Sequence, residues 1–409
     1  MIAPRRQKRA RRRPFRRARA LPLPPTCENV AGRVTRAEPL PCKTGKAPTR
    51  WQGAAALACA AALLVLACAG CADGAGGAAS STSATATRSF TSMATGMTLT
   101  VHASNQQAAD DAAETCEERV EQLDRLLAAN GDESQIALLN NAGGTVTFVS
   151  DDLQPLFEAA CSVAQETGGA FDPTIYPLTS AWGFTDGNHR VPSDDELAAL
   201  LPRVSFERLR ADASAGTVVL EDNAQVDVGG VAKGFAADEL RALLAKRDVT
   251  SALLDLGGNV TALGTKPDGS AWRVGVADPA APDRLAGTLE LVDATASTSG
   301  TYQRFFVDGN GVKRHHLIDP ATGYPAESDL ASVTVVGTCG ARCDALSTAL
   351  FVMGSDRALD VWRAQAEGGS GSFEAVFVDE GGNVLVTEGI ASAFSPSADF
   401  ADRVTEVRR

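Results

Sequence analysis

Apolar residues recur at two different spacings along this chain. Between residues 107 and 130 they fall three or four positions apart, at Ala109, Ala113, Cys116, Val120, Leu123 and Leu127. This spacing predicts an amphipathic helix. Over residues 95–101 apolar and polar residues alternate instead, which predicts a half-buried β-strand.

The same two patterns continue through the rest of the chain. Further helices are predicted over residues 153–167, 193–201, 231–246, 343–353 and 357–367. Further strands are predicted over residues 218–220, 226–228, 252–256, 272–276, 287–291, 332–336 and 375–378. Helices and strands alternate, but hairpin-like strand pairs also occur. We therefore expect an α+β fold, with residues 89–409 forming a single large domain of packed helices on a mostly antiparallel sheet.

The N-terminal part of the chain has the features of an export signal. Residues 1–50 contain 15 Lys and Arg but two acidic residues, and an apolar run of 14 residues follows at 54–67. Such a run is short for a membrane-spanning helix and suits a signal peptide. Because small residues stand directly before Cys71, the segment resembles the lipobox of bacterial lipoproteins. Cys68 is an alternative lipidation site, and ordinary signal cleavage is another.

We accordingly predict that residues 1–70 form a basic leader and lipoprotein signal peptide, with a start site possible further along. Residues 71–88 are rich in Gly, Ala, Ser and Thr, which is typical of a flexible tether. The expected location is outside the cytoplasm, anchored by lipid at Cys71 to a bacterial membrane. After residue 50 the chain has 23 basic and 48 acidic residues, so we expect no nucleic-acid partner.

The segment DVGGVAKGFAAD, residues 227–238, predicts an anion site. Gly229 and Gly230 allow a tight turn with close backbone approach to a ligand. Lys233 then falls in the first turn of a helix, where free N–H groups favour phosphate. The P-loop and dinucleotide fingerprints are both absent. The alternative is an ordinary glycine turn before an amphipathic helix with a solvated lysine.

Two other segments carry candidate ligand contacts. In residues 168–184, GGAFDPTIYPLTSAWGF, the rings of Tyr176, Trp182 and Phe184 could stack on a flat ligand or close a core. Further along, His315 and His316 lie near three basic residues, which suggests a phosphorylated ligand. Adjacent strand residues point to opposite faces, so at most one histidine faces a site. His316 could equally be a structural histidine.

A candidate cation site lies at the start of the helix predicted over residues 343–353. Asp344 and Thr348 are four positions apart and therefore share a helical face. A carboxylate and a hydroxyl there can bind Mg²⁺ with waters and ligand phosphates. The alternative is an Asp favourable to the helix dipole and a Thr that bonds its own backbone. Nearby, Cys339 and Cys343 suit either buried thiols or one small disulfide.

These segments together resemble one protein family. The ordered set is MAT at Met93, S-x-x-x-x-x-N from Ser134 to Asn140, GGAFDPTIYPLTSAWGF, DVGGVAKGFAAD, LLDLGGNVTALG, TSGTYQRFF, HHLIDPATGYP and SVTVVGTCGARCDALST. The chain is similar over residues 89–394 to FAD:protein FMN transferases of the ApbE family. The resemblance implies an ApbE-like fold of the T-fold type. It also implies an enzyme that splits FAD, releases AMP and attaches FMN through its phosphate to a threonine hydroxyl of an exported acceptor protein, using Mg²⁺.

The resemblance also implies roles for individual residues. FAD contacts are expected from Met93, Ala170, Phe171, Asp172, Asp227, Lys233, His316, Leu317 and Ile318. The Mg²⁺ ligands would be Asp344, Thr348 and the carbonyl of Gly230. His316, Asp319 and Lys233 are the candidate catalytic residues, with His316 or a nearby carboxylate as the base.

Two departures from the family pattern concern the flavin. Asn130 stands where the family often has an aromatic ring, and M-A-T replaces the usual M-G-T. Two rival functions also stay open at this point. The first is a lipoprotein that binds FAD or hydrolyses it to FMN and AMP without transfer. The second is a membrane-tethered scaffold without a ligand.

Overall fold

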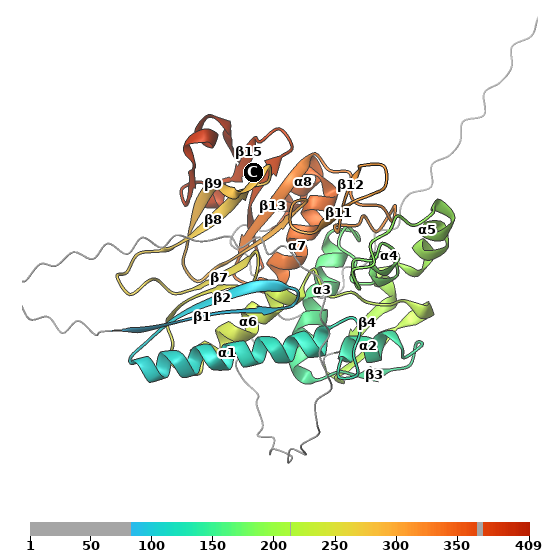
Figure 1. Cartoon of the computed structure of the whole chain (residues 1–409), viewed down its shortest axis with the longest axis horizontal. Helices are drawn as coiled ribbons and strands as arrows, with labels where there is room; N and C mark the ends of the chain where they lie inside the picture. The colour runs from blue at the N-terminus through green and yellow to red at the C-terminus, as the bar shows by residue number, and fades with distance from the viewer. Residues whose placement is uncertain (1–82, 213, 366–370) are drawn as a thin grey trace, which may run out of the picture. The chain divides into compact units, whose positions relative to one another are not determined.

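A computed structural model describes residues 83–212, 214–365 and 371–409. Among these residues the largest sheet has nine strands (Figure 1). In spatial order they are β1 (Ala84–Ser92), β2 (Thr95–Ala103), β6 (Ser251–Asp255), β7 (Asn259–Leu263), β10 (Thr295–Gly300), β13 (Leu330–Gly337), β14 (Glu374–Asp379), β15 (Val384–Thr387) and β17 (Val404–Val407). Each neighbouring pair is antiparallel except β15 and β17, which are parallel. The predicted α+β fold with a mostly antiparallel sheet is therefore confirmed.

Three smaller sheets complete the strands of the described residues. They comprise β16 (Phe394–Pro396), β9 (Ala281–Leu291) and β8 (Trp272–Asp278); β3 (Thr147–Phe148), β5 (Thr217–Leu220) and β4 (Leu209–Asp212); and the hairpin of β11 (Phe305–Val307) and β12 (Lys313–His315). The α-helices are α1 (Gln106–Leu127), α2 (Gln135–Asn140), α3 (Gln154–Glu166), α4 (Tyr176–Ala181), α5 (Asp194–Leu200), α6 (Ala232–Ala245), α7 (Gly340–Met353), α8 (Ser355–Ala364) and α9 (Glu388–Ala391). No helix among the described residues is both long and apolar enough to cross a membrane.

The large sheet is buried on both faces, and β14 shows why. Its Ala375 and Phe377 belong to a core shared with α1, α3, α6 and α7, whereas Val376 and Val378 belong to a second core shared with β8 and β9. Because successive strand residues point to opposite faces, one apolar strand can serve both cores. The layers are thus helices, the nine-stranded sheet, and the small β16-β9-β8 sheet.

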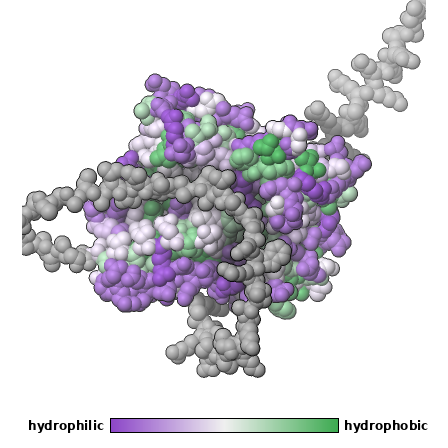
Figure 2. Space-filling view, in the orientation of Figure 1, coloured by the Kyte–Doolittle hydropathy of each residue, from purple (hydrophilic) through white to green (hydrophobic). Residues whose placement is uncertain are grey.

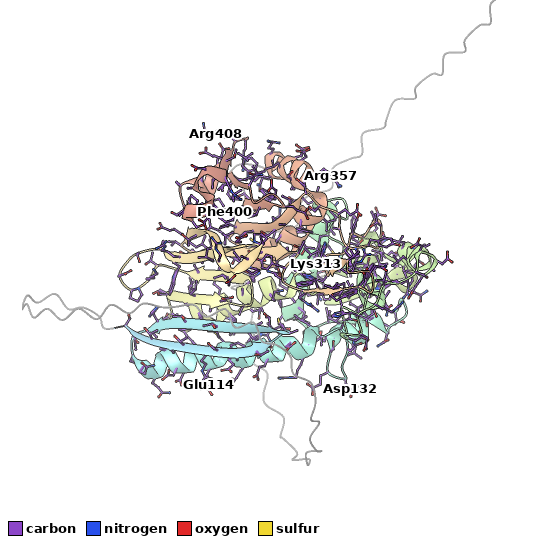
Figure 3. The ribbon with its side chains drawn as sticks, turned by 45° about the horizontal axis from the view of Figure 1, so that its top comes forward. Glu114, Asp132, Lys313, Arg357, Phe400 and Arg408 are labelled. Atoms are coloured by element: carbon purple, nitrogen blue, oxygen red, sulfur yellow. The ribbon has the colours of Figure 1, made fainter. Side chains whose placement is uncertain are left out.

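The amphipathic helix predicted first is α1, and its apolar positions are buried against β1 and β2. Its opposite side is polar and forms a hydrophilic band at the lower edge of the molecule (Figure 2). Glu114 lies on this solvent side (Figure 3). Asn105 caps the helix by accepting a hydrogen bond from the N–H of Ala108 at 3.0 Å.

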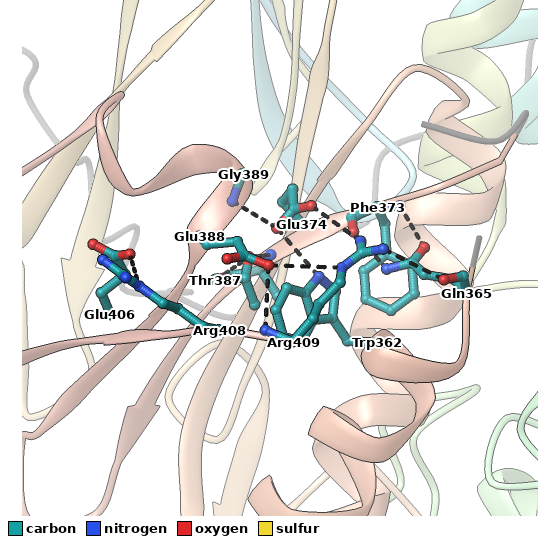
Figure 4. A network of polar contacts seen from close by, with 11 residues as sticks. Trp362, Gln365, Phe373, Glu374, Thr387, Glu388, Gly389, Glu406, Arg408 and Arg409 are labelled. Carbon is teal, nitrogen blue, oxygen red and sulfur yellow. Dashed lines mark hydrogen bonds and ion pairs between the residues drawn. The ribbon is translucent and has the colours of Figure 1, made fainter. Parts of the chain in front are cut away.

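A polar network holds the end of the chain, just after the outer strand β17, against α8 and β14 (Figure 4). The guanidinium of Arg409 lies 5.0 Å from the ring centroid of Trp362 on α8. It also pairs with Glu374 of β14 at 3.6 Å. Trp362 donates its ring N–H to the same Glu374 at 3.2 Å, so one carboxylate joins the helix, the sheet and the edge strand.

The structure corrects the predicted boundary between tether and domain. β1 begins at Ala84, so the tether predicted over residues 71–88 extends too far and the domain begins before residue 89. Every residue of β1 pairs with β2, and Ala86 is buried. The threonine-rich composition that suggested a linker also favours a strand. The predicted leader and signal peptide over residues 1–70, and Cys71, lie outside the described residues.

The strand predicted over residues 226–228 is also wrong. The side chain of Asn140 occupies the place of a pairing strand: its Nδ2 donates to the carbonyl of Val226 at 2.9 Å, and its Oδ1 accepts the N–H of Val226 at 2.6 Å. The segment is therefore an extended loop held by an amide side chain. Ser134, the other fixed residue of S-x-x-x-x-x-N, caps α2 by accepting the N–H of Ala137 at 3.0 Å.

Candidate active site

The DVGGVAKGFAAD segment is a braced turn that leads into α6. Asp227 holds the turn from both sides, since its Oδ1 accepts the N–H of Gly229 at 2.9 Å and its Oδ2 accepts the hydroxyl of Thr179 at 2.8 Å. Thr179 comes from α4, in the GGAFDPTIYPLTSAWGF segment. The predicted contact of Asp227 with FAD stays a prediction, and the structure adds this turn-holding role.

Helices α6 and α7 meet at their N-terminal ends through two glycines. A Cβ atom on Gly234 would lie 2.1 Å from the carbonyl oxygen of Gly340, and a Cβ on Gly340 would lie 2.4 Å from the carbonyl oxygen of Gly234. Only residues without a side chain allow so close an approach of two backbones. This contact joins the DVGGVAKGFAAD and GTCGARCDALST segments.

Each of these two helices supplies a carboxylate to the end of the other. Asp238 of α6 accepts the N–H groups of Gly340 and Ala341 at 2.8 and 2.9 Å, and burial raises the pKa of its carboxyl. Asp344 of α7 accepts the N–H of Gly234 at 3.0 Å. Both carboxylates therefore meet otherwise unpaired N–H groups at the positive end of a helix dipole.

Asp344 is 5% exposed and has no cationic side chain within ion-pair distance among the described residues. Its Oδ1 accepts the hydroxyl of Ser297 at 3.0 Å, and Ser297 in turn accepts Nδ2 of Asn259 at 3.0 Å. A buried carboxylate ordinarily requires a compensating positive charge. Each carboxylate oxygen has a second lone pair, so the group retains the capacity to bind a cation.

The other two predicted metal ligands lie beside Asp344. A Cβ on Gly230 would be 3.4 Å from Oγ1 of Thr348 and 3.1 Å from the ring of Phe171. Thr348 is one turn after Asp344 on α7, and its hydroxyl is 3.3 Å from that of Ser299. No group of three or more His, Cys, Asp or Glu that could hold a metal occurs among the described residues. The carboxylate of Asp344, the hydroxyl of Thr348 and the backbone carbonyl of Gly230 would supply oxygen ligands of the kind that Mg²⁺ accepts when water and phosphate complete the set.

His316 is half-buried beside Lys233, and its ring orientation is fixed. Its Nδ1 lies 3.1 Å from the carbonyl oxygen of Arg304. Because a carbonyl only accepts hydrogen bonds, Nδ1 carries the proton and Nε2 retains a free lone pair. Burial, together with the positive charges of Arg304 and Lys233, lowers the pKa of His316 to about 3. The imidazole is therefore neutral near pH 7 and can accept a proton at Nε2.

The two adjacent histidines face opposite sides, as expected. His315 is buried and packs edge-on against the ring of Phe351 at a centroid distance of 5.6 Å. Burial lowers the pKa of His315 to about 4. Only His316 of the pair is placed beside Lys233.

The residues that follow His316 have mainly structural contacts. Leu317 and Ile318 are each 5% exposed and lie in the core, so a contact with FAD would come from their backbone. Asp319 closes its own turn: its Oδ1 accepts the N–H of Ala321 at 2.9 Å, and its N–H donates to Tyr324 at 2.8 Å. A catalytic role for Asp319 stays a prediction that no contact in the structure supports.

Asp172 also points into the protein. It is 6% exposed, its Oδ1 accepts the N–H and hydroxyl of Thr174, and its Oδ2 accepts the N–H of Phe206 at 2.8 Å. Burial raises its pKa against the opposing effect of these hydrogen bonds. The carboxylate thus braces the loop. Of the three residues predicted to contact FAD in this turn, Ala170 is half-buried and Phe171 lies against Gly230.

Met93 and Ala94 form the two-residue turn between β1 and β2. Both have positive φ, 47° and 58°, as the tight hairpin turn requires. The departure from M-G-T therefore places alanine where glycine is favoured. Asp124 of α1 holds the turn by accepting the N–H of Met93 at 2.9 Å.

A ring does lie near Asn130, the position where the family often has an aromatic residue. The hydroxyl of Tyr176 on α4 donates to Oδ1 of Asn130 at 3.4 Å. The other two aromatic residues of that segment close a core, since Trp182 and Phe184 are buried with Leu178, Leu197 and Ile318. Packing is thus the role of the Trp182 ring, whereas Phe184 both packs and lines a cavity.

A cavity of about 440 Å³ lies at Arg304, whose carbonyl holds His316. Its lining comes from three distant segments: Ala94; Phe184, Thr185, Gly187 and His189; and Gln303, Arg304 and Phe305. Arg304 connects the second and third of these segments, because its guanidinium donates to the carbonyl of Phe184 at 2.9 Å, and its own carbonyl holds His316. The volume is in the range of small-molecule sites.

The structure also adds residues that sequence spacing did not assign to the site. They are Asn259, Ser297, Asp238, Thr179 and Asp124. Each lies in or near a recognised segment, but its role depends on a partner at least 31 positions away. Of the two alternatives for Cys339 and Cys343, the structure has thiols and not a disulfide. Cys343 is buried, which raises the pKa of its thiol, and Sγ of Cys339 lies 3.7 Å from Asp238.

Known proteins resemble this chain in both sequence and fold. The FAD:protein FMN transferase of Treponema pallidum is 38% identical over 260 residues, which cover 60% of this chain and 72% of the relative. That of Klebsiella pneumoniae is 31% identical over 280 residues, covering 68% and 85%. The crystal structure of the ApbE protein of Thermotoga maritima matches with a TM-score of 0.69 at 30% identity, over 76% of this chain and 99% of that one.

The apo flavinyl transferase ApbE of Pseudomonas stutzeri matches with a TM-score of 0.65 at 27% identity, over 76% of this chain and 98% of that one. The ApbE family model matches residues 93–373, which include the hairpin turn, both glycine-joined helices and the His316 loop. The resemblance inferred from the ordered segments is confirmed, and this chain belongs to the ApbE family.

Proposed function

We propose that this protein transfers FMN from FAD to a hydroxyl group of an acceptor protein and releases AMP. Its relatives of 38% and 31% identity are named FAD:protein FMN transferases. The observation that carries the proposal is the convergence at the first turn of α6. There the positive charge of Lys233 acts on His316, whose pKa burial holds well below its usual range, and Gly234 donates to Asp344. A base, a cation and a carboxylate thus surround one helix N-terminus, where a diphosphate binds well.

The proposed step is an in-line displacement at phosphorus. The acceptor oxygen attacks the phosphorus on the FMN side of FAD, while its proton passes to Nε2 of His316. The bond from that phosphorus to the bridging oxygen breaks, and AMP leaves with that oxygen. A bound diphosphate would place negative charge beside His316, which favours the protonated imidazole and raises its proton affinity in the complex. Lys233 would neutralise part of the phosphate charge.

We also propose that Asp344, Thr348 and the Gly230 carbonyl hold Mg²⁺. The supporting observations are that the Asp344 carboxylate is 5% exposed with no cationic side chain within ion-pair distance among the described residues, and that Gly230 lies against the hydroxyl of Thr348, one turn after Asp344. The ion would stabilise the charge that develops on the transferring phosphate. The chain's own contribution is to hold these oxygens in place through Ser297 and the N–H of Gly234.

The finer details of the acceptor and location are proposals from the sequence. The acceptor group is a threonine hydroxyl of an exported protein. The enzyme itself is exported and attached to the bacterial membrane by lipid at Cys71. Labelling cells with a radioactive fatty acid and comparing wild type with Cys71→Ala tests the anchor, and label retained in that variant would refute it.

The transfer is tested by incubating the folded domain with FAD, Mg²⁺ and a flavin-acceptor protein, followed by intact-mass measurement of the acceptor. We expect a gain of one FMN and an equal amount of AMP. Free FMN with an unmodified acceptor would show that the protein hydrolyses FAD instead.

The metal site is tested by Asp344→Asn, with Asp238→Asn as the matched control. Both residues are carboxylates in the α6–α7 contact, but Asp238 only caps a helix. We expect Asp344→Asn to raise the Mg²⁺ concentration for half-maximal rate by roughly tenfold or more. Asp238→Asn should lower stability and leave that concentration unchanged. An unaltered Mg²⁺ dependence in Asp344→Asn would remove this residue from the site.

A further inference from the structure

The β11–β12 hairpin carries an exposed apolar face directly beside the cavity. Phe305 is 45% exposed, Val307 59% and Val312 44%. Figure 2 shows this area as a hydrophobic patch over the β11–β12 region. Isolated apolar residues at the surface are ordinary, but a contiguous group next to a ligand site marks an interaction surface.

The two faces of this hairpin differ in their partners. On the inner face Phe306 packs on Trp182 and stacks on His189 at a centroid distance of 5.0 Å. On the outer face Phe305 and Val307 alternate with it, and Val307 pairs with Lys313 across the strands. The ammonium of Lys313 lies 4.3 Å from the ring centroid of Phe305, which confirms that these side chains share one face. The hairpin is therefore anchored by Phe306 on its inner face and by His315, which packs on Phe351, at the base of its outer face. Beyond His315 the outer face leaves an apolar and cationic surface exposed.

This surface is electrostatically distinct from the rest of the domain. Residues 303–316 contain three basic residues and one acidic residue, whereas the chain after residue 50 has about twice as many acidic as basic residues. The one acidic residue, Asp308, is paired with Arg314 at 2.9 Å and its side chain is 2% exposed. Lys313 has no carboxylate within ion-pair distance among the described residues. The outer face thus suits a partner segment that is apolar and negatively charged.

The surface is continuous with the candidate active site. Phe305 lines the cavity, the neighbouring Arg304 holds His316 by its carbonyl, and β12 ends one residue before His316. A macromolecule bound on the outer face would thus reach the cavity at Phe305, next to Arg304, whose carbonyl holds the base that receives the proton. A transferase that modifies a protein must hold its second substrate at such a place.

We infer that the outer face of the β11–β12 hairpin, formed by Phe305, Val307, Val312 and Lys313, is the docking surface for the acceptor protein. It binds an apolar, acidic segment near the hydroxyl that becomes modified. This inference rests on the proposed transfer of FMN. Apolar contacts supply the affinity, and Lys313 supplies selection for negative charge.

The apolar contribution is tested by the double variant Val307→Ser, Val312→Ser. Neither residue lines the cavity, so FAD binding should be unaffected. The matched control is Phe148→Ser, since Phe148 is 80% exposed on β3 and belongs to a different sheet. We expect the double variant to raise the KM for the acceptor by roughly tenfold and to leave the KM for FAD within twofold of wild type. The control should change neither constant.

The charge contribution is tested by Lys313→Glu, with Arg357→Glu on α8 as the control; both positions are exposed and appear in Figure 3. Lys313→Glu should raise the KM for the acceptor, with the difference from wild type shrinking as salt screens it. Equal constants for the hairpin and control variants would overturn the docking surface while leaving the transfer intact. Absence of any transfer by the wild-type protein would overturn the proposed function and this surface with it.

Discussion

The contact between Gly234 and Gly340 makes a strong prediction for Gly234→Ala. A Cβ at position 234 would lie 2.1 Å from the carbonyl oxygen of Gly340, 2.4 Å from its carbonyl carbon and 2.8 Å from the nitrogen of Ala341. All three are backbone atoms, so no side chain can rotate away. Helices α6 and α7 would have to separate at their N-terminal ends.

The expected cost follows from opposing terms. Alanine is better than glycine inside a helix by about 1 kcal/mol. Forcing apart a packed contact costs about 1–3 kcal/mol. Weakening the bond from Gly234 to the charged Asp344 costs about 1.5–3 kcal/mol. The steric and hydrogen-bond terms win, and we expect a net loss of about 1.5–5 kcal/mol, which corresponds to a fall in Tm of about 2–7 °C for a domain of this size.

The assay is thermal unfolding followed by circular dichroism, together with the Mg²⁺ dependence of transfer. We expect a lower Tm and a higher Mg²⁺ concentration for half-maximal rate, because the contact between α6 and α7 positions Asp344. The control is Gly96→Ala, where a Cβ would meet nothing within 4 Å and φ is not positive. This control should leave Tm unchanged or raise it slightly. A Gly234→Ala protein as stable as Gly96→Ala would refute the close-packing argument.

Three further changes have defined outcomes. Ala94→Gly should raise the free energy of unfolding by about 1 kcal/mol, since Ala94 has φ 58°, and chemical denaturation with an unchanged or lower stability would count against this. Ser297→Ala should weaken Mn²⁺ binding, used as a probe for Mg²⁺, by roughly tenfold in a direct titration, because Ser297 orients Asp344; an unaltered affinity would exclude that positioning role. Burial lowers the pKa values of His315 and His316 to about 4 and 3, so the unfolded chain, with a pKa near 6.5, binds more protons below that pH. Their contribution to stability is complete above pH 6.5 and falls towards pH 3, and His315→Phe should make Tm less sensitive to pH over this range; an equal pH dependence would contradict the assignment.

Much of the secondary structure follows from local pattern. The spacing of apolar residues predicts α1 within a few residues, and Ser193, the first residue of the helix predicted over residues 193–201, caps α5 by accepting the N–H of Glu196 at 3.2 Å. Periodicity and capping depend on neighbours within a turn or two, so a sequence contains them directly. The same holds for Lys233 in the first turn of α6.

The misassigned segments depended on distant partners. The extended backbone at Val226 resembles a strand, but an amide from Asn140 takes the place of the neighbouring strand. β1 resembles a linker in composition and becomes a strand because β2 pairs with it. Pairing partners are set by tertiary contacts that β-propensity does not contain.

The sequence by itself determined the family, the main helices and strands, and the residue types that the chemistry requires. Tertiary structure decided which of these residues converge. Asp344 reaches the N–H of Gly234 across 110 positions, whereas Asp172, an equally plausible carboxylate, turns inward to Phe206. Whether a carboxylate faces a ligand or braces a loop depends on which N–H groups folding brings within hydrogen-bond distance. That is a property of packing, and local sequence does not specify it.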